Sequence, residues 1–187
     1  MITSQVIAID QHNFRIILQA MSHPGRIFQL YDTEPNAFFA VIRALLDQEV
    51  SFWVSVEDIG LAQKIHAMTG SPVAQSSAAD FLIMPGGSSF VGIYKAKRGT
   101  PEYPDQSATI IYDVEELSDD GNGNSLVLLT GPGIESELKL NAHGPLLNAL
   151  LDLSVVNADF PLGVDSIFLD KGGRIMSIPR STRIKVG

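Results

Sequence analysis

The sequence predicts an α/β protein in which helices cover the faces of one mixed β-sheet. In the first half of the 187-residue chain, segments with apolar residues at helical spacing alternate with short strand-like runs. In the second half, strand-like runs follow one another with turn signals between them. This order is typical of a sheet that combines parallel and antiparallel pairs.

The first half contains three longer predicted helices, one short one and three predicted strands. Apolar residues at helical spacing, together with capping and breaking residues, place the helices at Asp10–Ser22, Glu34–Asp47 and Asp58–Met68. In the first of these, Asp10 is the expected N-cap, and Pro24 and Gly25 end the helix. Alternation or short apolar runs place the strands at Arg26–Leu30, Val50–Val56 and Phe81–Met84. A loop at 85–89 and a short helix at Phe90–Lys97 complete this half.

The second half is predicted to be richer in strands. Two apolar runs, Thr109–Val114 and Leu126–Thr130, are separated by the Asp-Gly and Asn-Gly signals of residues 119–124, so adjacent antiparallel strands are expected. Leucines at 146, 147, 150 and 151 indicate a helix. The chain is then predicted to end in strands at Val164–Leu169, Arg174–Ile178 and Ile184–Val186.

Composition excludes several classes of function. The chain has no cysteine, which excludes disulfides, thiolate metal sites and a cysteine nucleophile, and is consistent with a reducing compartment. Its net charge of −8 argues against nucleic-acid binding, which needs a basic surface. Neither a secretory signal nor a membrane-spanning run is visible, so we expect one cytoplasmic domain over residues 1–187. The four histidines have no metal-ligand spacing, and no metal site is expected.

Two motifs attract attention but favour structural interpretations. His23 follows the first predicted helix, where a capping role is favoured over proton transfer. Residues 130–134 form a Thr-Gly-Pro-Gly-Ile turn that lacks the third glycine of a dinucleotide fingerprint. A tight turn is therefore favoured over a ligand loop, and the sequence contains no nucleophile elbow or phosphate-binding loop.

The strongest candidate for ligand binding combines arginines and hydroxyls. Arg15 lies off the core stripe of its helix, and the stretch Arg180–Ser181–Thr182–Arg183 brings together two guanidinium groups and two hydroxyl groups. Such groups suit phosphate or carboxylate ligands. A surface strand end with solvated arginines is the structural alternative, and the residues taken alone favour it.

Four segments together resemble the PhnH family, the H subunit of carbon–phosphorus lyase. They are the helix around Phe14–Arg15 with Pro24–Gly25, the turn Leu129–Ile134, Phe160–Asp165, and Ile178–Thr182. They occur in the family's order and span nearly the whole chain. The resemblance implies a three-layer α-β-α fold like the large domain of pyridoxal-phosphate-dependent transferases, without the cofactor site, and hence no cofactor.

The resemblance also implies a role in bacterial phosphonate metabolism. It implies a homodimer that joins the G, I, J and K subunits and that, with G, I and L, supports transfer of the ribose triphosphate of ATP to methylphosphonate with release of adenine. No complete catalytic site of its own is expected. The alternative is a subunit that itself binds or acts on a phosphonate or a phosphorylated nucleotide through Arg15, Arg180, Ser181 and Thr182, with Asp165 and His23 as weak catalytic candidates.

Overall fold

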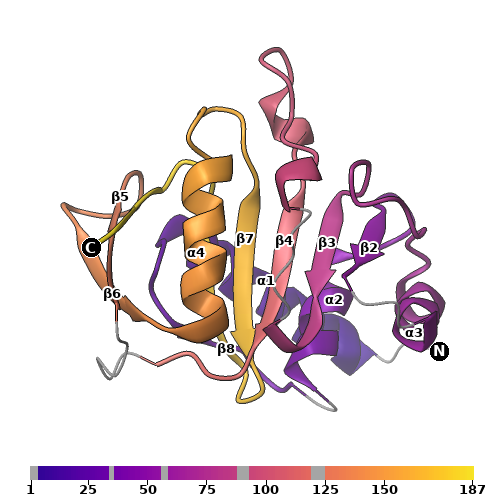
Figure 1. The fold of residues 1–187 in the computed structure, drawn as a ribbon. Coiled ribbons are helices and arrows are strands. Elements are labelled where there is room, and N and C mark those ends of the chain that lie inside the picture. Colours follow the sequence, from indigo (N-terminus) through magenta and orange to yellow (C-terminus); the bar gives the residue numbers. More distant parts are fainter. Residues whose placement is uncertain (1–3, 34–35, 56–58, 88–92, 119–124) are drawn as a thin grey trace.

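The larger of two β-sheets forms the middle layer of the molecule (Figure 1). A computed structural model describes residues 4–33, 36–55, 59–87, 93–118 and 125–187. The sheet has six strands in the order β1-β8-β7-β4-β3-β2. Their bounds are β1 Phe28–Gln29, β2 Phe52–Val54, β3 Phe81–Met84, β4 Thr109–Val114, β7 Asp165–Asp170 and β8 Arg174–Ile178. Strands β2, β3, β4 and β7 are parallel, whereas β8 is antiparallel to both of its neighbours, so the sheet is mixed as predicted.

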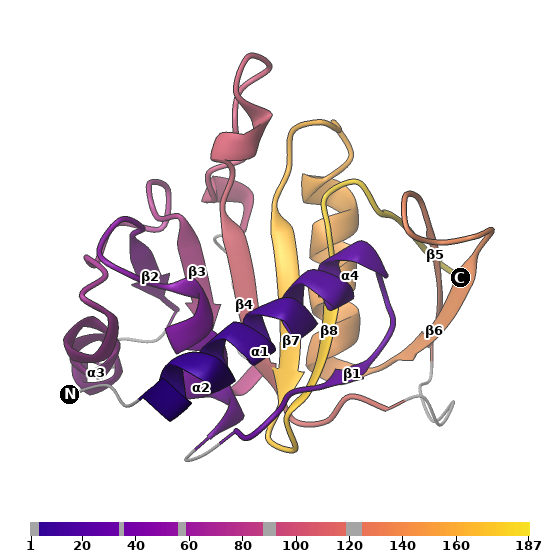
Figure 2. The ribbon, with the colours of Figure 1, turned by 180° about the vertical axis from the view of Figure 1, so that it is seen from behind.

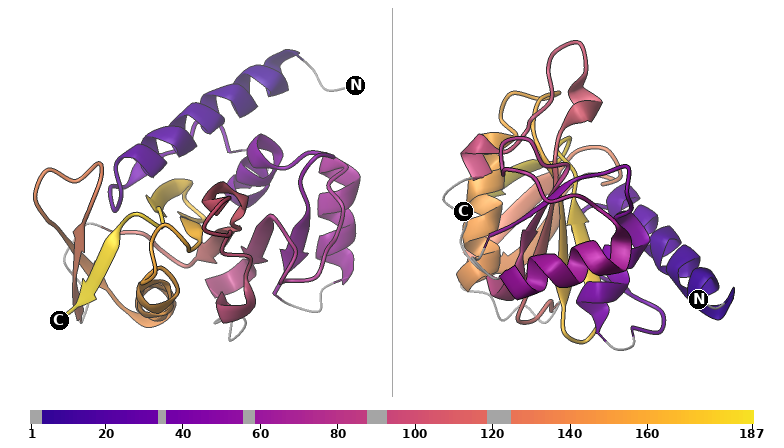
Figure 3. Two further views of the ribbon diagram at one scale, coloured as in Figure 1. Left: turned by 90° about the horizontal axis from the view of Figure 1, so that it is seen from above. Right: turned by 90° about the vertical axis from the view of Figure 1, so that its right-hand side faces the viewer.

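Helices cover both faces of this sheet. Helices α1 (Ser4–Ser22) and α2 (Ala37–Leu45) lie on one face, as Figure 2 shows, and α4 (Gly144–Val156) lies on the other (Figure 3). Helix α3 (Ile59–Thr69) lies beside β2 and contacts α2. Alternation along β4 explains the two cores, because Ile110 and Tyr112 join the cluster under α4 while Ile111 joins the cluster under α1 and α2.

A separate three-stranded antiparallel sheet stands beside the larger one. Its order is β6-β5-β9, formed by β5 (Ser125–Thr130), β6 (Leu138–Ala142) and β9 (Arg183–Val186). The inner residues of β5 and β6, among them Val127 and Leu140, join the same core cluster as α4. Burial of this shared apolar surface holds the small sheet against the rest of the molecule.

Two predictions about the sheets are wrong: the pairing of two strands and the presence of a single sheet. Strands β4 and β5 are not paired with each other, because β4 lies between β3 and β7 and β5 lies between β6 and β9. Both faces of β4 are buried, as expected for a central parallel strand and not for a half-exposed hairpin. Strand β6 was not predicted, and its presence gives the protein two sheets in place of one.

The predicted helices exist with shifted ends. Helix α1 begins at Ser4, six residues before the predicted start, so Asp10 is not its N-cap. Asp10 instead pairs with Arg43 of α2 at 3.1 Å. Asn36 caps α2 by accepting a hydrogen bond from the backbone of Phe38 at 2.7 Å. Of the predicted helix Phe90–Lys97, the described part is a short turn at Ile93–Lys95, and residues 88–92 lie outside the described residues.

Candidate functional site at the junction of the two sheets

Segments far apart in the sequence meet where the small sheet joins the large one. We use the name junction for the end of α1 (22–25), the β5–β6 turn (130–134), the segment after α4 (157–164) and the β8–β9 connection (179–183). A Cβ atom added at Gly131 would lie 2.8 Å from the carbonyl oxygen of Ser181. At Gly133, it would lie 2.3 Å from the carbonyl oxygen of Ser22. These contacts leave room only for glycine, so the glycines of the Thr-Gly-Pro-Gly-Ile turn have a packing role, and the turn also lines the cavity described below.

The segment after α4 is fixed by a side chain that closes the helix. The Asn157 amide donates to the carbonyl of Val164 at 3.1 Å, and its oxygen accepts from the Val164 amide at 2.8 Å. Gly163 leaves the space for this pair, since a Cβ there would lie 2.4 Å from the Asn157 oxygen. Asn157 is almost completely buried and was not singled out from the sequence. It aligns the start of β7, and with it Asp165, against the β8–β9 connection.

Arg180 and Asp165 form the most densely bonded pair at the junction. One carboxylate oxygen of Asp165 accepts from the backbone amide of Arg180 at 2.9 Å, and the other lies 3.3 Å from its guanidinium. The same guanidinium donates to the carbonyl of Pro104 and, at 2.5 Å, to the hydroxyl of Ser107. Its acceptors therefore come from the chain itself, and Arg180 ties the β8–β9 connection to the segment before β4.

A cavity of about 660 Å³ opens beside this pair. It is lined by Thr130, Gly131, Pro132, Ser154, Asn157, Ala158, Phe160, Arg180, Ser181, Thr182, Arg183 and Ile184. Arg183 is its exposed cation, and the buried hydroxyl of Thr182 has no hydrogen-bond partner. The carboxyl end of α4, whose carbonyls carry partial negative charge, forms one wall. The cavity thus offers one available positive charge and an opposing helix dipole, a modest site for a highly charged anion.

Arg15 does not share this cavity. It is exposed on α1 and lines a second hollow of about 530 Å³ between α1 and α2, together with Phe14, Asp10 and Arg43. The two hollows have no described lining residue in common. The structure therefore brings Asp165, Arg180, Ser181 and Thr182 together and leaves Arg15 elsewhere.

His23 lies at the carboxyl end of α1. Its Nδ1 atom is 3.0 Å from the carbonyl oxygen of Gln19, and the Ser22 hydroxyl donates to the same carbonyl at 3.0 Å. The backbone amide of His23 also donates to this carbonyl at 3.0 Å, so both side chains add capping contacts at the carboxyl end of the helix. His23 is exposed and lines neither of the two hollows.

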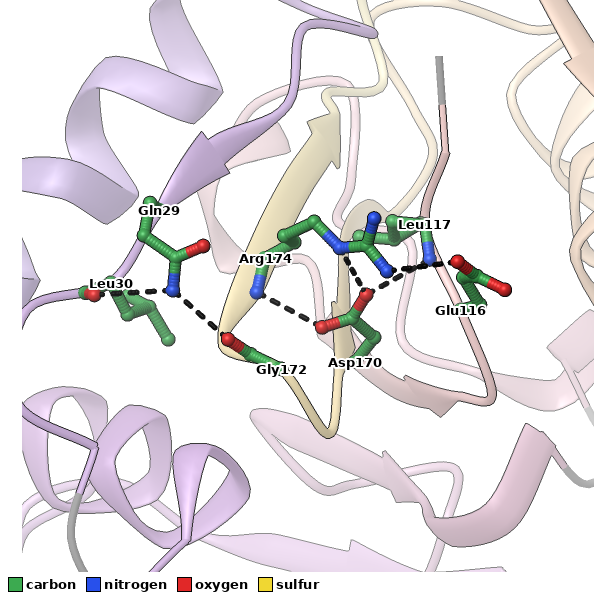
Figure 4. A network of polar contacts seen from close by, with 7 residues as sticks. All are labelled: Gln29, Leu30, Glu116, Leu117, Asp170, Gly172 and Arg174. Atoms are coloured by element: carbon green, nitrogen blue, oxygen red, sulfur yellow. Dashed lines mark hydrogen bonds and ion pairs between the residues drawn. The ribbon is translucent and has the colours of Figure 1, made fainter. Parts of the chain in front are cut away.

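A second polar network lies at the opposite end of β7 (Figure 4). Asp170, 1% exposed, accepts from the backbone amides of Leu117 and Arg174 at 3.0 Å each. It also accepts from the Arg174 guanidinium at 2.7 Å, and that guanidinium reaches Glu116 at 3.2 Å. Nearby, burial raises the pKa of the Asp113 carboxyl above its usual value. The Asp170 network fixes the turn after β7 and the segment after β4, a structural role that no sequence motif indicated.

The described lining of the junction cavity does not fit a pyridoxal phosphate site. That cofactor needs a lysine facing a cavity that also holds its phosphate. The junction cavity contains no lysine among its described lining residues. Lys97 pairs with Asp80 at 2.5 Å, and Lys64 lies over the ring of Phe39.

The fold and the junction define the class of protein. It is an α/β protein in which Arg180, Asp165 and the glycines of the β5–β6 turn make structural contacts where the two sheets meet. Among the described residues, no helix has the length and hydropathy to cross a membrane. Residues 3–185 match the family described as bacterial phosphonate metabolism protein (PhnH), and the chain belongs to that family.

Two relatives support this assignment. The chain is 31% identical over 184 residues to a protein of Stutzerimonas stutzeri described as a C-P lyase subunit protein, HtxG, covering 95% of this chain and 86% of the relative. It is 28% identical over 185 residues to the alpha-D-ribose 1-methylphosphonate 5-triphosphate synthase subunit PhnH of Rhizobium meliloti (strain 1021), covering 94% and 90%.

Proposed function

We propose that this chain is a non-autonomous subunit of a carbon–phosphorus lyase system, needed for phosphonate catabolism. In this role it supports, together with the G, I and L subunits, transfer of the ribose triphosphate moiety of ATP to methylphosphonate with release of adenine. The observation that carries the proposal is the family match over residues 3–185. The name of the Rhizobium relative, a synthase subunit, supports the specific reaction.

The geometry of the junction favours an assembly role over an independent catalyst. Arg180 is bonded within the chain, Asp165 is bonded to Arg180, and His23 is placed as a cap. Arg180 and Asp165 would each have to give up a contact before acting on a substrate, and His23 lines neither hollow. A subunit that lends its surfaces to partners needs no such rearrangement. In this proposal the chain also forms a homodimer before it joins the G, I, J and K subunits.

The direct test is complementation in a bacterium that lacks its own H subunit and carries the other subunits. The expected result is growth on methylphosphonate as the sole phosphorus source and co-purification of the G, I, J and K subunits with the tagged chain. Growth failure with a folded, expressed chain, together with failure to retain any of these subunits, would overturn the proposal.

A second candidate function is direct binding of a phosphonate or nucleotide in the junction cavity. Exposed Arg183 and the unpartnered Thr182 hydroxyl favour it, because both line the same hollow. Replacing Arg183 with alanine would then weaken binding of ATP or methylphosphonate, measured by calorimetry on the assembled complex. Lys185→Ala is the matched control, since Lys185 is exposed on the same strand outside the cavity lining. Equal affinities for the two variants and the wild type would exclude this function.

A further inference from the structure

Helix α1 has apolar residues on two faces. Its inward face carries Asn13, Ile17 and Ala20, which are buried against the body of the protein. Its outward face carries Ile7, Phe14 and Leu18, which are 50%, 41% and 51% exposed. These three positions are separated by seven and four residues and so form one stripe along the helix. Large apolar side chains aligned in this way on a surface mark an interaction site when they adjoin a hollow.

The outward stripe borders the hollow between α1 and α2. Ile7 and Phe14 line this hollow of about 530 Å³ with Gln11, Arg15 and Ala44. Packing inside the chain leaves Phe14, Arg15 and Leu18 exposed. The hollow runs along α1 from Ile7 to Arg15, and Leu18 extends the apolar stripe one turn beyond it. Figure 3 shows this helix lying along the outside of the molecule. We use the name groove for the hollow together with the stripe.

The charges around the groove are unbalanced. Asp10, the acidic residue lining the hollow, is paired with Arg43, which donates to both carboxylate oxygens at 3.1 to 3.3 Å. Arg15 is exposed, and no carboxylate within the described residues pairs with it. The groove therefore presents, beside apolar side chains, one positive charge that has no ion-pair partner among the described residues. The net charge of the protein is −8.

We infer that the outward face of α1 docks an amphipathic helix of a different subunit, with a carboxylate placed against Arg15. This inference rests on the proposed function. An apolar stripe with a concave border suits the helix-in-groove mode, in which anchors of the partner recur at helical spacing. A second copy of the chain fits less well, because the same face of a second copy offers Arg15 no free carboxylate: Asp10, the acidic residue lining the hollow, is already paired with Arg43. A lipid surface fits less well too, since anionic lipids repel a protein of this charge.

The test uses the co-expressed complex and two matched double variants. Phe14→Glu with Leu18→Glu places charge on the α1 stripe. Leu151→Glu with Val155→Glu places charge on α4, where the two side chains are 41% and 58% exposed. The α1 double variant is expected to lower recovery of the partner subunits at least tenfold, and the α4 control to leave it unchanged. Arg15→Glu is expected to weaken recovery, and Arg15→Lys to retain most of it. Thermal unfolding and circular dichroism of each isolated variant establish that it is folded.

The possible outcomes separate this inference from the proposed function. If the wild-type chain retains no partner subunit, the proposed function fails and the inference falls with it. If the wild type retains its partners and the folded α1 variants retain them equally, only the inference is overturned. A variant that loses self-association in light scattering but keeps its partners would assign the face to a second copy. Binding of the isolated wild type, and not the variant, to phosphatidylcholine vesicles would assign the face to a membrane, and either result overturns the inference.

Discussion

The guanidinium of Arg180 is surrounded by acceptors from its own chain. Its position in an Arg-Ser-Thr-Arg stretch indicated an anion site, and the stretch does line a cavity. The sequence could not reveal that Pro104, Ser107 and Asp165 occupy the guanidinium, because these residues belong to other segments that folding brings to it. Residue type and spacing thus pointed to a candidate anion site, which stays a prediction, but not to which groups are free.

Replacing Arg180 with alanine is expected to destabilise the fold. The change removes hydrogen bonds to Pro104 and Ser107 and leaves the half-buried Asp165 carboxylate without its cation. Charged hydrogen bonds at partly buried positions contribute about 1.5–3 kcal/mol, so a loss of about 2 kcal/mol is expected. Urea unfolding measures it, with Arg183→Ala as the exposed control. Equal midpoints for the two variants would show that Arg180 is not a structural clamp.

The ion pair between Asp80 and Lys97 gives stability a defined pH dependence. Burial raises the pKa of the Asp80 carboxyl, but hydrogen bonds from Lys97 and Ser51 outweigh this effect, so that its pKa is lowered from 3.8. A lowered folded pKa stabilises the protein above the unfolded value, and this contribution is lost as the pH falls through the folded pKa. Asp80→Asn is expected to cost about 0.5–1 kcal/mol at neutral pH, because solvent screens this partly exposed pair.

The same substitution is expected to cost progressively less as the pH falls below 3.8. Urea unfolding of wild type and variant across this range gives the difference. Glu137→Gln serves as a control, since its pair with Lys139 is exposed and 3.8 Å long. A difference between wild type and Asp80→Asn that stays constant with pH would contradict this account.

At the level of elements, the sequence predicted the bounds of strands best where a continuous apolar run marks the strand. The bounds of β3, β4 and β8 agree with the prediction, and all four helices were expected. Pairing failed because turn signals at 119–124 report only on the local chain, whereas β4 gains its partners from Phe81–Met84 and Asp165–Asp170. The fold relationship to pyridoxal phosphate transferases and the single-domain organisation stay predictions.

Helix α4 offers a direct test of which leucines hold it in place. Leu150 is fully buried in the core beneath the helix, whereas its neighbour Leu151 is 41% exposed. Leu150→Ala is expected to lower the free energy of unfolding by about 2–5 kcal/mol, because it removes buried methyl groups and leaves a cavity. Leu151→Ala is expected to change it by about 0.5 kcal/mol or less. Chemical denaturation measures the free energy of unfolding of both variants. A larger loss for Leu151→Ala than for Leu150→Ala would place the opposite face of α4 against the sheet.

At the scale of the whole molecule, the junction couples α1, the two sheets and the end of α4. Gly131 and Gly133 allow the β5–β6 turn to contact the β8–β9 connection and the end of α1, so the small sheet is fixed from two directions. The four segments that carry the family resemblance all contribute to this junction. A sequence motif can thus identify a family through a structural joint as well as through a reactive site.

Gly133→Ala is therefore expected to disturb the molecule more than an ordinary glycine substitution. Gly133 has φ of +83° and Gly70 has φ of +77°, so both substitutions place alanine in the left-handed region, at a cost of about 1–2 kcal/mol. At Gly70 the new methyl group would meet ordinary contacts at 3.6 Å, whereas at Gly133 it would strike the backbone of Ser22. Thermal unfolding should rank Gly133→Ala well below Gly70→Ala. Equal melting temperatures would show that the turn can move away from α1 at little cost.

The ends of the large sheet limit how copies of this protein can adhere to one another. Strand β1 is only two residues long, and in the three-residue strand β2 the outward amide and carbonyl of Phe52 are bonded to residues 72 and 74. Neither end therefore offers a long row of free amides and carbonyls on which a foreign strand could grow. Fibril-like stacking through this sheet is therefore disfavoured, and contacts made by side chains are the expected way for its layers to meet other proteins.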